Sequence, residues 1–328
     1  MNYHEAKNEF QKLFEHKMSD REMRDFLISM RLDETTSVES IAAAASVMRD
    51  HAIKLHVDTS LTPKLIDIVG TGGDKSGSFN ISTTTSILVA SCGAYVAKHG
   101  NRSITSKSGS ADVLEALGVR LDLTLGQSAK MLEDSGFCFM FAQNHHPAMK
   151  FIMPIRKSID EKTVFNVLGP LTNPAGVEKF LLGVFDKAFV PKIAEALKIN
   201  DAKSAIVVSA AEGMDEISIS GITYAASLQD GIIKEFEIDP ETYAIKRAPF
   251  DAILGGNAKE NAEILRNVLS NKASDAQRDI VLINSSAALV AEGMARDIQD
   301  GLEIARDAIN SGKALSKLKQ IVEVSSKL

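Results

Sequence analysis

The 328-residue chain is poor in the features that mark several large classes of protein. Its two cysteines, Cys92 and Cys138, lie in apolar surroundings and form no CxxC pair. Such cysteines are typical of buried, reduced thiols, and they argue against a disulfide framework or a zinc site. No apolar run approaches the length of a membrane span, and residues 1–18 mix charges without an apolar signal-peptide core. We therefore expect a soluble cytoplasmic protein that does not bind a membrane.

The chain also lacks a surplus of positive charge. Its 43 acidic residues outnumber its 37 lysines and arginines, which gives a formal net charge of -6 at pH 7. Nonspecific binding to a nucleic-acid backbone requires an excess of Lys and Arg over the contact surface, so this balance argues against a nucleic-acid partner. A local basic pocket remains compatible with it. The length is typical of roughly two domains.

The first 60 residues have the pattern of consecutive helices. Ser19 with Glu22, and Thr36 with Glu39, have the spacing of a capping box, and each pair precedes a segment with helical apolar periodicity. A Thr-Pro pair near residue 63 then interrupts the pattern. The sequence therefore predicts a small helical region that ends close to this position.

From there the chain alternates between short apolar runs and helical patterns. This alternation predicts an α/β fold with a mainly parallel sheet, whose ligand sites lie at the carboxyl ends of the strands. Asp230-Gly231 predicts a hairpin turn with antiparallel pairing, and helices are expected from about residue 257 to 326. The expected parallel strands are residues 65–70, 94–100, 137–142, 179–185 and 204–210.

The stretch GTGGDKS at residues 70–76 follows the first strand and is similar to two well-known phosphate-binding loops. It is not a P-loop, because Asp74 stands where a glycine must precede the Lys-Ser pair, and Lys75 replaces the last glycine of the dinucleotide fingerprint. The glycines still let backbone amides approach an anion, and Asn80 is placed to cap a helix that opens with the hydroxyls of residues 82–84. A phosphate site is favoured, with a tight turn before a capped helix as the alternative.

A second polar stretch, KHGNRSITSKSGSAD at residues 98–112, follows the next expected strand. It contains two Lys, one Arg, five hydroxyl side chains and two Gly. At the carboxyl end of that strand these groups would face the same crevice as the glycine loop, where they suit several phosphate oxygens. A solvated loop is the alternative interpretation.

Six stretches, taken together, resemble the anthranilate phosphoribosyltransferase family. They keep the order and spacing of the family from about residue 65 to the C-terminal segment, and the helical N-terminus also suits it. The pyrimidine nucleoside phosphorylases, which share the fold, carry a different lysine-glycine loop and are a weaker match. The six stretches are GTGGD at 70–74, FNIST at 79–83, KHGNRS at 98–103, SGSADVLEALG at 108–118, VFNVLGPLTNPA at 164–175 and GMDEIS at 213–218.

The resemblance implies transfer of the phosphoribosyl group from phosphoribosyl diphosphate to the amine of anthranilate, with release of diphosphate, in tryptophan biosynthesis. The aromatic amine would attack an oxocarbenium-like ribose carbon, with inversion and without a covalent enzyme intermediate. The residues that it implies for the sugar donor are Gly70, Gly73, Asp74, Ser78, Asn80, Ile81, Ser82, Thr83, Lys98, His99, Gly100, Asn101, Arg102, Ser103, Ile104, Thr105, Ser106 and Ser110.

Asp215 and Glu216 are adjacent acids that come after the strand expected at 204–210. Alone they would be typical of solvated surface, but beside a diphosphate their oxygens suit Mg²⁺. The resemblance implies two Mg²⁺ ions, one held by Ser82 and Glu216 and the other by Asp215 with Glu216. Together with Lys98, the metal would stabilise the leaving diphosphate, so the implied catalysis is electrostatic.

The acceptor site needs apolar walls and one fixed cation for the carboxylate of anthranilate. Arg156 matches the arginine that binds this carboxylate in the family, and a planar guanidinium suits bidentate recognition. As an isolated residue it would be read as a surface arginine. His99 is implied to line the channel of the amine as well. The remaining acceptor-site residues implied by the resemblance are Gly70, Asn101, His146 and Pro170.

The chain departs from the family pattern at three places. Gln143 replaces a usual proline, Met149 stands where some relatives have an aromatic residue, and SIDEKT at 158–163 replaces a more common LG-x-RT. All three concern the acceptor side or the helix that supports it. They therefore affect the detail of acceptor recognition and leave the expected reaction unchanged.

The resemblance also implies two hinged domains. One is helical, with residues 1–65 and a returning segment near 160–183, and the other is the α/β domain of residues 66–328. Closure of the hinge would exclude water from the reactive cation. A homodimer formed through the helical domain is implied as well. A nucleoside phosphorylase of this fold and a non-enzymatic nucleic-acid-binding relative are the alternatives.

Overall fold

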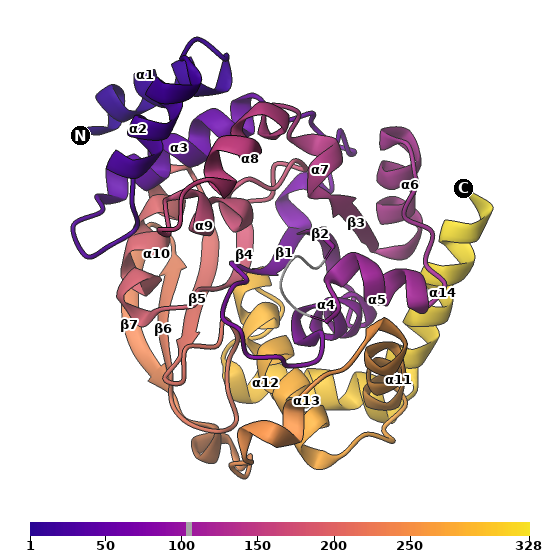
Figure 1. The fold of residues 1–328 in the computed structure, drawn as a ribbon. Coiled ribbons are helices and arrows are strands. Elements are labelled where there is room, and N and C mark those ends of the chain that lie inside the picture. The colour runs from indigo at the N-terminus through magenta and orange to yellow at the C-terminus, as the bar shows by residue number, and fades with distance from the viewer. Residues whose placement is uncertain (103–106) are drawn as a thin grey trace.

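The computed structural model, which describes residues 1–102 and 107–328, is built around one seven-stranded sheet (Figure 1). The strands lie in the order β3-β2-β1-β4-β5-β6-β7, with β1 to β5 mutually parallel and β6 and β7 antiparallel. All five expected parallel strands are confirmed. The strands are β1 (Leu65–Gly70), β2 (Tyr95–Gly100), β3 (Phe137–Phe141), β4 (Lys179–Gly183), β5 (Ser204–Ala210), β6 (Thr223–Gln229) and β7 (Ile232–Ile238).

The hairpin between β6 and β7 is confirmed at the expected turn. Asp230 and Gly231 have φ angles of 51° and 75°, and Gln229 pairs with Ile232. Two consecutive residues with positive φ are the mark of a type I′ turn, whose twist matches that of the strands on either side.

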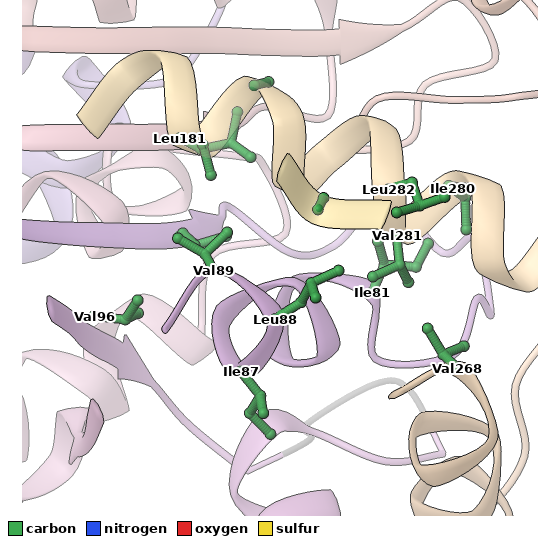
Figure 2. Close-up of a cluster of buried hydrophobic side chains, with 14 of the residues drawn as sticks. Ile81, Ile87, Leu88, Val89, Val96, Leu181, Val268, Ile280, Val281 and Leu282 are labelled. Atoms are coloured by element: carbon green, nitrogen blue, oxygen red, sulfur yellow. The ribbon is translucent and has the colours of Figure 1, made fainter. Parts of the chain in front are cut away.

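One face of the sheet is covered by the C-terminal helices and by the two helices that follow β1 and β2. Figure 2 shows the centre of this layer, where Ile81 lies close to Val281 and Val89, at the other end of α4, lies nearer Leu181 of the sheet. The apolar sides of these elements form one continuous core. The helices on this face are α4 (Ile81–Ser91), α5 (Ser110–Ala116), α11 (Ala258–Leu269), α12 (Asp275–Glu292), α13 (Ile298–Asn310) and α14 (Lys313–Lys327).

The N-terminal helices belong to a second core on the other face of the sheet (Figure 1). Leu65, Ala97, Leu182 and Val207 point into this core, because side chains alternate between the two faces of a strand. Its helices are α1 (Tyr3–Phe14), α2 (Asp20–Ser29), α3 (Val38–Asp50), α8 (Met149–Lys157), α9 (Phe165–Leu168) and α10 (Val190–Ile199).

One of the two expected capping boxes is present. Ser19 and Glu22 cap α2 reciprocally, as the spacing predicted. The second prediction was wrong by one residue: α3 begins at Val38, and the side chain of Ser37 accepts from the amide of Ser40. Thr36 instead bonds residues 31 and 33 of the preceding turn. Adjacent Thr and Ser side chains compete for the same cap, and the geometry of the turn decides between them.

The remaining helices are short or lie at the edge of the sheet. Helix α6 (Leu125–Ser135) packs against β3 and α14, and α7 (Ala142–His145) follows β3 directly. Among the described residues, no helix is both long enough and apolar enough to cross a membrane. Short 3-10 turns occupy Thr62–Lys64, Gly169–Leu171, Lys187–Phe189, Pro240–Tyr243 and Phe250–Ile253.

Candidate active site

The glycine loop leaves the carboxyl end of β1 in a backbone conformation that suits glycine. Gly72, Gly73 and Gly77 have φ angles of 66°, 74° and 68°, and Lys75 has 57°. Residues with a side chain rarely adopt such angles, so the glycines are required for the course of the loop. In the sheet, β1 has β2 on one side and β4 on the other. The order of the strands therefore reverses between β1 and β4, and α/β folds bind their ligands at such a position.

Asn80 stands directly before α4, but its side chain does not cap that helix. The expected cap was therefore wrong. The amide of Asn80 donates to the carbonyl oxygen of Ser108 at 3.2 Å and accepts from Asn261 Nδ2 at 2.9 Å. These bonds tie the start of α4 to the end of the second polar loop and to α11. The first amides of α4 are thus not capped by Asn80, and the amide of Ser82 instead donates to the carboxylate of Glu216.

Lys98 of β2 is the buried cation of the site, with 1% of its surface exposed. Its Nζ donates to the carbonyl oxygen of Ile68 at 2.6 Å and to Ser82 Oγ at 3.3 Å. Burial lowers the pKa of Lys98, and the charges of Asp67, Glu216 and Asp215 oppose that effect. The ammonium group therefore lies between β1, the start of α4 and the acidic pair.

Asp215 and Glu216 are surrounded by protein, although each keeps some exposed surface. Burial, followed by the charge of Asp74, raises the pKa of Asp215 to about 7. Burial and the charge of Asp215 raise the pKa of Glu216 well above its ordinary value. The amide of Gly72 donates to Asp215 Oδ2 at 2.7 Å, so the acidic pair is joined to the glycine loop. Three acids crowded together in this way favour a cation between them.

The donor chemistry of this cluster fits magnesium. Asp74, Asp215, Glu216 and the hydroxyl of Ser82 are all hard oxygen ligands. No group of three or more His, Cys, Asp or Glu side chains within the described ranges is already arranged to hold a metal. Mg²⁺ ordinarily takes only one or two protein carboxylates and completes its shell with water and substrate phosphates, so the two observations agree.

Two glycines give the acidic loop its position. A Cβ built on Gly70 would overlap Asp215 Oδ2, and one built on Gly183 would overlap the main-chain oxygen of Asp215. These glycines end β1 and β4, the strands on either side of the reversal of strand order. The loop of Asp215 can therefore cross the ends of both strands only because neither carries a side chain there.

His99 and His146, two residues predicted for the acceptor site, form a buried pair. Their ring centroids lie 5.2 Å apart, and His99 Nδ1 lies 3.3 Å from the carbonyl oxygen of Gly169, next to Pro170. Burial, and then the neighbouring imidazoles, lower the pKa of His99 to about 3 and that of His146 to about 4. These lowered pKa values favour the neutral form of both rings at physiological pH.

Arg156 of α8 is a half-buried cation with no ion pair among the described residues. Its guanidinium carbon lies 5.9 Å from the centre of the Phe165 ring. Burial lowers the pKa of Arg156. A guanidinium beside an aromatic ring and without a carboxylate partner is suited to bind the carboxylate of a small aromatic acid.

The other predicted site residues differ in where they lie. Gly73, Asp74 and Ser78 belong to the glycine loop, and Ile81 to Thr83 form the first turn of α4. Gly100 ends β2, Asn101 follows it, and Ser110 begins α5. Ser103, Ile104, Thr105 and Ser106 lie outside the described residues.

Arg102 points away from this group. It is exposed and bonds Asp112 at 3.0 Å and Glu115 at 2.6 Å, both on α5. These contacts raise the pKa of Arg102, and they engage the guanidinium that was expected to bind the sugar donor. Its place in the donor site remains a prediction.

The sequence reasoning missed Asp67 and Asn173, which lie at the centre of the site. Asp67 is fully buried and accepts from the amide of His99 at 3.2 Å and from Asn173 Nδ2 at 2.8 Å. Burial raises its pKa to about 6, against the charge of Lys98 and these hydrogen bonds. The available signal was a single acid in the apolar strand LIDIVG.

The fold and the site together define a glycosyltransferase. Residues 62–315 match the model of the family described as "Glycosyl transferase family, a/b domain". A relative in Xanthobacter autotrophicus, an anthranilate phosphoribosyltransferase, is 45% identical over 99% of this chain and 92% of its own length. The chain belongs to the anthranilate phosphoribosyltransferase family, which confirms the resemblance seen in the sequence.

Solved structures of the same family agree with this assignment. The anthranilate phosphoribosyltransferase of Thermus thermophilus has a TM-score of 0.90 and 35% identity, covering 99% of this chain and 96% of its own. The Saccharomyces cerevisiae enzyme in complex with PRPP and Mg has a TM-score of 0.86 and 28% identity, covering 99% and 93%. The same yeast enzyme has also been solved with 4-fluoroanthranilate.

Proposed function

We propose that this chain transfers the phosphoribosyl group of phosphoribosyl diphosphate to the amine of anthranilate, giving N-(5-phosphoribosyl)anthranilate and diphosphate, as a step of tryptophan biosynthesis. The observation that carries the proposal is the convergence of Lys98, the acidic pair Asp215-Glu216 and the glycine loop at the ends of β1 and β4. Membership of the family supports the choice of substrates.

The donor side would work by electrostatic stabilisation of the leaving group. Ser82 with Glu216 would hold one Mg²⁺ ion and Asp215 with Glu216 a second, and bound magnesium would neutralise the charge of the diphosphate. Lys98 would donate hydrogen bonds to the oxygens of the diphosphate. The amide of exposed Gly73 would add a hydrogen bond that needs no reorganisation, whereas the amide of Gly72 is already bonded to Asp215.

On the acceptor side, Arg156 would bind the carboxylate of anthranilate, and the neutral His99 and His146 would line the path of its amine. With both imidazoles uncharged, the developing positive charge on the ribose meets no competing cation from this wall. The amine would attack opposite the diphosphate. A protein nucleophile is not required for this direct displacement.

The proposal is tested by following anthranilate fluorescence. The chain has no Trp and only four Tyr, so protein emission interferes little. We expect the signal to fall only when folded protein, phosphoribosyl diphosphate and Mg²⁺ are all present, and to stay constant when any one is omitted. A constant signal in the complete mixture would contradict the proposed function.

Replacing Arg156 by Ala should weaken binding of the acceptor alone. A hydrogen-bonded charge pair is worth about 1.5–3 kcal/mol, so we expect the KM for anthranilate to rise roughly ten- to a hundredfold while the KM for the donor changes little. Arg156→Lys should recover part of the loss, because it restores charge without the bidentate geometry. Equal increases in both KM values would assign Arg156 a different role.

We also propose the quaternary and cellular setting by analogy with the family. Residues 1–65 with a returning segment near 160–183 would form one domain, and residues 66–328 the other. A homodimer through the helical part, working in the cytoplasm, completes the proposal. Packing of α8 against α2 supports a link between the early helices and the segment before residue 160.

A further inference from the structure

Strands β1 and β2 separate toward the end that carries the site. Their ladder joins Leu65 to Tyr95 and Ile66 to Val96 and then stops. By contrast, β1 stays paired with β4 as far as Gly70, and β2 stays paired with β3 as far as Gly100. The separation is therefore confined to the gap between β1 and β2.

Three side chains replace the missing ladder bonds. Asp67 Oδ1 accepts from the amide of His99, and Asn173 Nδ2 donates to the carbonyl oxygen of Ala97 at 2.8 Å. Lys98 Nζ donates to the carbonyl oxygen of Ile68. Asp67 Oδ2 also accepts from Asn173 Nδ2, which joins two of the three replacements into one unit.

Fold stability alone does not account for this arrangement. A continued ladder would satisfy the same backbone groups without burying an acid, and taking a carboxylate out of water is costly even when it is hydrogen-bonded. The buried acid instead connects two parts of the site. Asp67 fixes the backbone at His99, and Asn173 belongs to the segment that carries Gly169 and Pro170 on the acceptor side.

We propose that Asp67 is a positioning residue for the transfer reaction, which acts with Asn173 to hold the ends of β1 and β2 apart and to fix Lys98 and His99 relative to residues 169–175. The inference rests on the proposed function, because it assigns the donor contact to Lys98 and the acceptor wall to this segment. Neither Asp67 nor Asn173 touches a substrate in this proposal.

The test uses Asp67→Asn and Asn173→Ser in the full chain. In Asp67→Asn the new NH₂ group must face either the amide of His99 or Asn173 Nδ2, so in both orientations two donors oppose each other and the unit must shift. A misplacement of reacting groups by about 1 Å costs up to about a hundredfold in rate. We expect kcat to fall at least about tenfold in each variant, while the calorimetric affinity for phosphoribosyl diphosphate with Mg²⁺ stays within about threefold.

The double variant tests whether the two residues act as one unit. Because they share a hydrogen bond, we expect its kcat to match that of the more impaired single variant, not the product of the two losses. Ser286→Ala is the matched control, since it removes a buried hydrogen bond of 2.5 Å to Ile298 between α12 and α13, away from the site. It should lower the melting temperature without changing kcat.

The outcomes are distinct. A kcat within about twofold of wild type in folded Asp67→Asn, or losses that multiply in the double variant, would overturn the inference. If Asp67→Asn does not fold, Asn173→Ser decides by the same criterion. A wild-type chain that transfers nothing to anthranilate would contradict the proposed function instead, and its activity must be established first.

Discussion

Asp215→Asn and Glu216→Gln should each abolish most turnover and flatten its dependence on magnesium. The substitutions keep the size of the side chains but remove the charge that would hold the metal against the diphosphate. Losing one such electrostatic contact typically costs roughly 10²–10³ in kcat. The measurement is the initial rate of anthranilate consumption across a magnesium titration. An unchanged magnesium response in either variant would refute the metal assignment.

Glu212→Gln is the matched control for these substitutions. Glu212 is an exposed acid three residues before Asp215 on the same loop, and glutamine can still accept the hydrogen bond from Ser218. We expect this variant to keep the wild-type magnesium response. A loss equal to that of Asp215→Asn would indicate that the charge of the loop as a whole, and not the acidic pair, governs the response.

Asp215→Asn should also stabilise the metal-free protein at neutral pH. The pKa of Asp215 is about 7 in the folded chain, and it is about 3.9 for an unperturbed Asp. The folded state thus binds more protons between these values, so this group reduces stability as the pH rises through that window. Asp215→Asn removes the effect. The melting temperature of Asp215→Asn should equal that of wild type at about pH 3.9 and exceed it above about pH 7.

Gly183→Ala should damage both stability and activity although it changes no polar group. The added methyl would overlap the main-chain oxygen of Asp215, so either the end of β4 or the acidic loop must move. Overpacking of this kind costs about 1–3 kcal/mol. We expect a lower midpoint in urea and a kcat reduced at least about tenfold, since the loop carries the carboxylates of the site.

Gly126→Ala separates this effect from the general consequences of replacing glycine. Gly126 lies in α6 at an ordinary helical φ, and a Cβ there would meet no described atom within 4 Å. Removing a helical glycine stabilises a protein by about 0.4–1 kcal/mol. The control should therefore raise the urea midpoint and keep kcat. A urea midpoint equal to that of wild type in Gly183→Ala would contradict the expected overlap between the added methyl group and the loop of Asp215.

The sequence predicted the parallel strands and the main groups of the site because their signals are local. Apolar runs separated by helical patterns indicate buried parallel strands, and Asp230-Gly231 selects its turn by backbone preference alone. The glycine loop and the Asp215-Glu216 pair each follow a strand, and Lys98 lies near the carboxyl end of β2, so parallel topology brings them to one edge.

What the sequence did not reveal depends on contacts between distant segments. Asp67 and Asn173 are 106 residues apart, and their partnership exists only because β1 and β2 separate. Asn80 was expected to cap α4, but its amide bonds Ser108 and Asn261, which tertiary packing brings within reach. Local sequence limits the hydrogen bonds that a side chain can form, and tertiary contacts determine which of them it forms.

The two faces of the sheet restrict how the active site can open and close. The early helices have no separate core: α10 contacts α3 on one side and β5 and β6 on the other, and one apolar cluster runs through all of them. Pulling these layers apart would expose that cluster to water. We therefore expect that small sliding movements of the packed helices cost less free energy than a wide swing of the early helices away from the sheet.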